Sequence, residues 1–195
     1  MDFAHVNHAE RPGVLPIAFS LFHAVQIEDG AALMLGAGPA VWNDEWSERL
    51  DLGVAEHGKH RSVDEMMAQR IGRGDAYRAY WAAVFARTEE WLAGMDPATL
   101  SEVVVARPLP ASLASTFSAR VAGPEGITGC DGIECWIFQH GLRHMGEIEH
   151  ARGLVGLGGM TSSAPRPTPG TRRACARAPG WSGRGSACAA APMTA

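Results

Sequence analysis

The chain has 195 residues, of which 46% are hydrophobic, which is enough for one globular domain with a sizeable core. Residues 161–195 contain five arginines and no acidic residue, so the rest of the chain has a net charge of −9 against −4 for the whole sequence. Because affinity for nucleic acids comes largely from clustered Lys and Arg, this acidic part excludes specific nucleic-acid binding as its function.

Three stretches in the first half of the chain have the spacing of apolar residues that is typical of helices. They run from Pro16 toward Gly36 or Gly38, from Val63 to Ile71, and from Ala76 to Ala93. Pro16 suits the first turn of a helix, and Gly94 closes the third stretch. Ser62, with Glu65 three residues later, forms a capping box for the second.

The second half of the chain gives one clear helix and one ambiguous segment. Residues 103–129 mix Pro, Gly and Ser with a short β-branched run, and a loop, a short strand and part of a helix all remain open. Asp131 and Glu134 resemble a second capping box, which opens a helix from about residue 133 to residue 157. Three long helices with polar connections predict an all-α bundle.

Residues 161–195 are rich in Pro, Gly, Ala and Arg and show no periodicity. Such a composition cannot bury enough apolar surface to offset the entropy of ordering, so we expect a helical domain over residues 1–160 and a disordered tail over 161–195. The abrupt loss of acidic residues after Met160 also fits a gene that is read in a shifted frame.

Two histidines on the last predicted helix suggest a metal site. His140 and His144 are four residues apart, so both imidazoles project from one face, and this face also carries Ile137 and Ile148. Taken alone, the pair fits buried core histidines at least as well as metal ligands. His23 on the first predicted helix could supply a third nitrogen, and three protein ligands would leave a position on the ion for water or substrate.

Two segments of the chain resemble the DinB-like superfamily. Residues 12–30, PGVLPIAFSLFHAVQIEDG, are similar to its apolar helix with a His and a following acidic pair, and residues 140–157, HGLRHMGEIEHARGLVGL, resemble its final-helix signature HxxxHxGE. The resemblance places His23, His140 and His144 at metal-ligand positions. It implies a DinB-like four-helix bundle over roughly residues 12–160.

The beginning of the chain departs from the family pattern. A long helix usually precedes the segment that begins here at Pro12, and this sequence has MDFAHVNHAER instead. We expect the bundle to lack its first helix, and the exposed apolar stripe would then favour a homodimer. A truncated gene or a misassigned start codon would explain the difference.

The resemblance implies a divalent metal ion, with zinc expected first and nickel, iron or manganese as alternatives. In the family, such an ion activates a low-molecular-weight thiol of the mycothiol or bacillithiol type for transfer to a small electrophilic substrate, or for isomerisation. Hydrolysis by activated water would use the same geometry. The alternative is a non-catalytic helical protein in which the metal is structural or absent.

Glu147 is the candidate catalytic residue, because it lies three residues beyond His144 on the same face. It could act as a base, bind substrate, orient a ligand, or remain a solvated carboxylate. Glu28 and Asp29 are expected to cap or solvate the first helix. The histidines His5, His8, His57, His60 and His150 are expected to lie away from the site, and Trp81, Phe85, Trp91 and Trp136 are expected in the core.

Other sites and locations are less well supported by the sequence. A zinc site that combines Cys130 and Cys135 with the last-helix histidines is disfavoured, because four residues separate Cys135 from His140 and a zinc finger needs about a dozen. The most apolar early stretch, residues 14–27, is too short to span a bilayer and follows no basic segment. We therefore expect a cytoplasmic protein with reduced cysteines and no membrane partner.

Overall fold

The computed structural model describes residues 3–57 and 61–157, all of which belong to one compact unit within residues 1–162. The predicted tail over 161–195 lies outside the described residues, as do His60, Cys175 and Cys188. Helices predominate, so the predicted all-α class is confirmed, with one small two-stranded sheet in addition.

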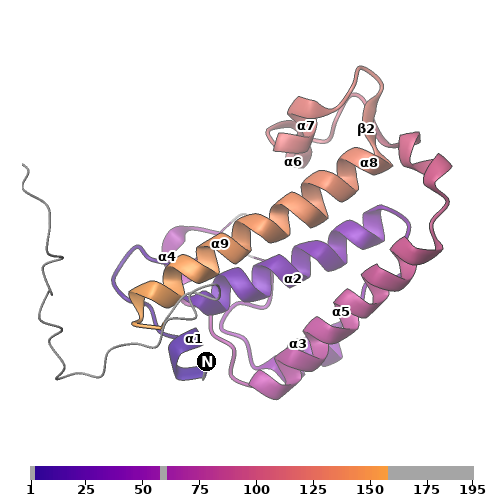
Figure 1. The fold of residues 1–195 in the computed structure, drawn as a ribbon. Coiled ribbons are helices and arrows are strands. Elements are labelled where there is room, and N and C mark those ends of the chain that lie inside the picture. Colours follow the sequence, from indigo (N-terminus) through magenta and orange to yellow (C-terminus); the bar gives the residue numbers. More distant parts are fainter. Residues whose placement is uncertain (1–2, 58–60, 158–195) are drawn as a thin grey trace, which may run out of the picture. The chain divides into compact units, whose positions relative to one another are not determined.

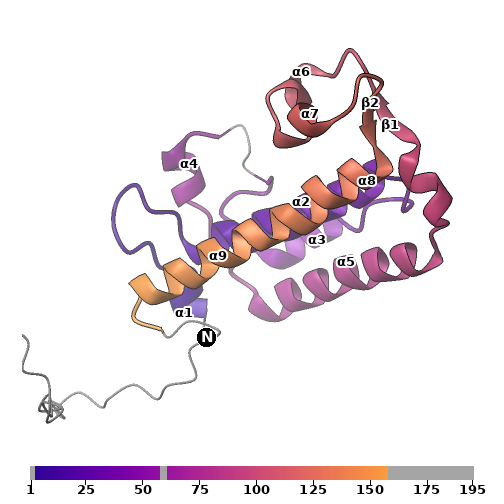
Figure 2. The same ribbon diagram turned by 45° about the horizontal axis from the view of Figure 1, so that its top comes forward.

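Three long helices form the body of the described unit (Figure 1). They are α2 (Ile17–Met34), α5 (Gly74–Gly94) and α9 (Gln139–Leu154). Helix α2 packs against both α5 and α9; it lies between them in Figure 1 and runs behind α9 in Figure 2. All three were predicted at nearly these positions, because their apolar residues recur at helical spacing.

Short elements precede and connect the long helices. Before α5 these are α1 (Phe3–Val6), α3 (Asp44–Leu50) and α4 (Val63–Met67). After α5 they are the 3₁₀ helix η1 (Pro97–Ser101), β1 (Val103–Ala106), α6 (Ala111–Ala114), α7 (Phe117–Val121) and β2 (Gly126–Thr128). The strands pair antiparallel, with Val105 opposite Ile127, so the β-branched run that the sequence left open is a strand.

The last helix begins earlier than the sequence predicted. Thr128 and Asp131 form a capping box at the start of α8 (Gly129–Gly132), so the predicted pair of Asp131 and Glu134 is wrong and lies three residues too late in the chain. A π-helix, η2 (Ile133–Phe138), then joins α8 to α9, and the ribbon is continuous across all three (Figure 1). The capping box of Ser62 and Glu65 at α4 is confirmed.

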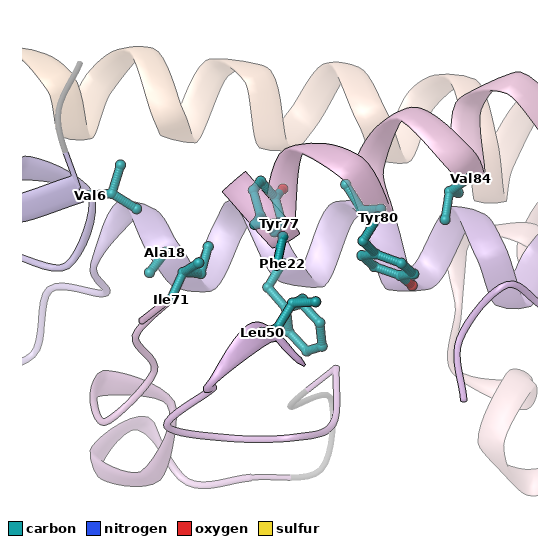
Figure 3. Close-up of a cluster of buried hydrophobic side chains, with 10 residues drawn as sticks. Val6, Ala18, Phe22, Leu50, Ile71, Tyr77, Tyr80 and Val84 are labelled. Carbon is teal, nitrogen blue, oxygen red and sulfur yellow. The ribbon is translucent and has the colours of Figure 1, made fainter. Parts of the chain in front are cut away.

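The hydrophobic core fills the space between α2 and α5 (Figure 3). Phe22 from α2 and Tyr80 from α5 are almost fully buried there, together with Leu50 at the end of α3. The ring centroids of Phe22 and Tyr80 are 6.5 Å apart, and the indole of Trp42 lies 5.3 Å from each of them. Val6 of α1 lies in the same cluster, so the short helices α1 and α3 share the core of the long ones.

Asp29 joins three parts of this core and is not solvated as expected. Its carboxylate accepts hydrogen bonds from the backbone N–H groups of Val41 and Trp42, at 2.9 and 2.8 Å, and from the hydroxyl of Tyr80. The guanidinium of Arg87 also donates to it, at 2.5 Å. Because a buried carboxylate needs such partners, Asp29 holds α2, the following loop and α5 together.

Two groups of large apolar side chains remain exposed. Trp81 on α5 is 44% exposed and packs on Phe85, so its predicted place in the core is wrong. Phe138, Leu142 and Met145, spaced four and three residues apart, are each at least half exposed. An exposed stripe was expected for a bundle without its first helix, and the homodimer remains a prediction.

Among the described residues, no helix has the length and apolar character to cross a membrane.

Candidate metal centre

His23, His140 and His144 come together where α2 packs against α9. One ring nitrogen from each lies within 4.8 Å of the others. His144 is buried, and His23 and His140 are partly buried. The three residues predicted as ligands therefore form a cluster that could hold a metal ion.

Hydrogen bonds on the far side of two rings fix which nitrogen faces the cluster. His144 Nδ1 donates to Glu147 Oε2 over 2.6 Å, and His23 Nδ1 donates to the backbone carbonyl of His57. An imidazole that donates from Nδ1 presents the lone pair of Nε2 on its other side. Metal-binding histidines are commonly held by such a partner, which orients the ring and makes the free nitrogen more basic.

The distance between the facing nitrogens of His140 and His144 suits the binding of one ion by both rings. His140 Nε2 and His144 Nε2 are 3.1 Å apart. Two imidazole nitrogens at about 2.0–2.1 Å from a tetrahedral zinc ion lie about 3.3 Å from each other. The pair needs only a small adjustment to take an ion between its nitrogens.

Burial favours the neutral form of His23 and of His144, which is the form that a metal requires. Desolvation lowers the pKa of His23 to about 4, a shift that the His57 carbonyl opposes and the neighbouring His144 adds to. Desolvation also lowers the pKa of His144, although Glu147 opposes this shift. Because a metal competes with protons for the same lone pair, imidazoles that are neutral near pH 7 are ready to bind.

A pocket of about 840 Å³ opens beside the cluster, lined by His23 and His140. Its other walls come from α2, from the α6–α7 segment and from η2. This volume is typical of small-molecule sites. A ligand in the pocket could therefore reach an ion that His23 and His140 hold.

The structure also places residues for which sequence analysis had no role. Ser20, three residues before His23, donates a hydrogen bond to Glu147 over 3.1 Å. His57 was expected to lie away from the site, yet its carbonyl contacts His23 and the residue lines the pocket. Only the spacing of Ser20 and His23 on one helix was visible in the sequence. Glu147, the predicted catalytic residue, contacts His144 and is 46% exposed in its side chain.

The fold and the cluster define a mostly helical protein with three histidines that could hold a metal ion. No protein-family model matches the chain, and no curated protein matches it significantly. It is similar to the crystal structure of a conserved protein from Enterococcus faecalis, with a TM-score of 0.62 and 19% sequence identity over 80% of this chain and 84% of that one. At this identity the likeness shows the fold alone.

Proposed function

We propose that the chain binds one divalent metal ion through His23, His140 and His144 and uses it to activate a small thiol or water. The convergence of three imidazoles from two helices carries this proposal. Zinc is the first candidate, because three neutral nitrogens suit it, and nickel, iron and manganese are alternatives. When bound, the ion would lower the pKa of a thiol or water at its open position and make it a nucleophile near neutral pH.

The residues around the cluster fit this chemistry. Glu147 and the His57 carbonyl hold His144 and His23 with Nε2 toward the cluster. The resemblance of residues 12–30 and 140–157 to the DinB-like superfamily supports a thiol such as mycothiol or bacillithiol as the nucleophile. We propose a transferase that joins this thiol to a small electrophile, or an isomerase or hydrolase that uses the same site.

The pocket favours catalysis over a structural metal. Structural zinc sites are usually closed by four protein ligands, whereas catalytic sites keep a position for water or substrate. Here three histidines form the cluster, and two of them line a pocket of about 840 Å³.

Single substitutions of the three histidines test the metal site. His23→Ala, His140→Ala and His144→Ala should each weaken binding of zinc or cobalt by at least about 100-fold, because two remaining ligands hold an ion poorly. Helix content should stay near that of the wild type. Metal content after purification and titration with a coloured competing chelator provide the measurement.

His150→Ala is the matched control, because His150 is exposed on the same helix α9 and is not part of the cluster. Its metal affinity should equal that of the wild type. Equal losses in the His150 and His144 variants would show that the site is misplaced. If added thiols did not change the spectrum of the cobalt-substituted protein, the metal would have a structural role and no catalytic one.

A further inference from the structure

We infer that the pocket beside the histidines binds a small molecule with a carboxylate or phosphate group, which Arg120 and Arg143 recognise. This inference rests on the proposed function, because it names the chemical class of the ligand that would meet the metal there. It goes beyond that function because the charge of the ligand follows from the lining of the pocket and not from the histidines.

The charge of the pocket is opposite to that of the domain around it. Residues 1–160 carry a net charge of −9. The pocket lining has two arginines, Arg120 and Arg143, and no aspartate or glutamate. A cleft with one sign of charge attracts ligands of the other sign, and here the positive charge stands out against an acidic surface.

Both guanidinium groups are available to a ligand. Among the described residues, neither Arg120 nor Arg143 forms an ion pair, whereas Arg49, Arg61 and Arg87 each do. Arg120 on α7 lies over the ring of Phe117, with its guanidinium carbon 5.6 Å from the ring centroid. Arg143 on α9 stands between the two histidines of that helix in the sequence, so an anion bound to it stays close to the metal site. A planar guanidinium matches a carboxylate or phosphate in two hydrogen bonds.

A third polar group in the pocket lacks a partner. The side-chain oxygen Oε1 of Gln26 is buried and accepts no hydrogen bond from the described residues. Gln26 lines the pocket and lies on α2 one turn beyond His23. Buried amide oxygens are usually satisfied, so Gln26 is a polar group of the pocket wall that the fold itself leaves without a partner. The ligand class therefore rests on Arg120 and Arg143, which favour an anion.

Matched thiols of different charge test the inference on the full-length, cobalt-loaded protein. Mercaptosuccinate carries two carboxylates, thioglycerol is neutral and cysteamine is cationic, and each offers one thiol to the metal. Calorimetric titration should show mercaptosuccinate binding at least about 10-fold tighter than thioglycerol, with cysteamine weakest. Competition with succinate and with inorganic phosphate separates carboxylate from phosphate recognition, and either result supports an anion site.

Substitutions assign the effect to the two arginines. Arg120→Gln and Arg143→Gln should each weaken mercaptosuccinate binding by roughly 3- to 10-fold, because the guanidinium groups are partly screened by solvent. Thioglycerol and cobalt binding should change by less than about 2-fold. Arg78→Gln is the matched control, since Arg78 is exposed on α5 outside the pocket, and it removes the same charge.

The outcomes distinguish this inference from the proposed function. If the protein binds cobalt but shows no preference for mercaptosuccinate, the anion site is refuted and the metal site stands. If it binds no metal, the proposed function fails, and titration of succinate into the metal-free protein still tests the arginines. If Arg78→Gln and Arg143→Gln weakened mercaptosuccinate binding equally, the preference for this anion would come from the net charge of the protein. That result would overturn the inference.

Discussion

Glu147 contacts His144 on one side and Ser20 on the other, and this arrangement suggests that it positions a metal ligand. Ser20 is buried and its hydroxyl holds the carboxylate in place, so the His144 ring is fixed through two successive hydrogen bonds. A carboxylate that orients a ligating histidine typically contributes 10- to 100-fold to metal affinity.

We therefore predict that Glu147→Ala lowers zinc affinity about 10-fold, near the lower end of that range because the carboxylate is half exposed. Glu147→Gln should lower zinc affinity less, since the amide oxygen of the glutamine can still accept a hydrogen bond from His144 Nδ1. The competing chelator used for the histidine variants measures both. Glu90→Ala, an exposed change on α5, is the control. Unchanged affinity together with a lost activity would instead assign Glu147 the role of a catalytic base.

Glu28 is a buried carboxyl on α2 that was expected at the surface. Burial raises its pKa from 4.5 to about 7; the hydroxyl of Thr88 opposes this shift, and Asp29 and Glu89 add to it. Between these two values the folded state binds more protons than the unfolded state. Stability from this group is therefore full below about pH 4.5 and is lost as the pH rises toward and through 7.

We predict that Glu28→Gln raises the free energy of unfolding by about 2 kcal/mol at pH 8 and by little at pH 4.5, because the amide cannot ionise. Urea unfolding of the variant and the wild type at the two pH values gives the comparison. Glu90→Gln, whose carboxyl is exposed, should show no such pH dependence. A variant that is equally stable relative to wild type at both pH values would mean that Glu28 ionises normally.

At the scale of the elements, periodicity predicted the long helices because each has a face that the core buries. The ends of the helices were harder to predict, since Asp131 can serve either as the first residue of a capping box or as the fourth. Sequence alone favoured the first role, and the structure shows the second, with Thr128 as the cap. A π-helix follows, which a period of 3.6 does not predict, and Phe138 at its end faces solvent, one residue after the predicted buried position Ile137.

The site was predictable to the extent that its residues share a helix or a motif. His140 and His144 were linked by their spacing, and His23 was added by its place in a segment that resembles a family. The contacts of His57 with His23 and of Ser20 with Glu147 span 34 and 127 residues of sequence. No local pattern encodes a contact over such a distance, so these partners of the ligands required the folded structure.

At the scale of the whole molecule, the site links the beginning of the described unit to its end. His23 lies on α2, which carries much of the core, and the other two histidines lie on α9, whose outer face has exposed apolar side chains. An ion held by all three would connect these helices only in the folded state. Metal binding is therefore expected to stabilise the fold as a whole.

We predict that zinc at 100 times its dissociation constant stabilises the protein by about 2.7 kcal/mol, which corresponds to a rise in Tm of roughly 5–10 °C for a domain of this size. Thermal unfolding followed by circular dichroism measures the shift. His144→Ala should show almost none of it, and magnesium should have no effect on the wild type, because magnesium prefers oxygen ligands. If zinc raised the Tm of the His144 variant as much as that of the wild type, the stabilising ion would be bound elsewhere, and the three histidines would not be the link between α2 and α9.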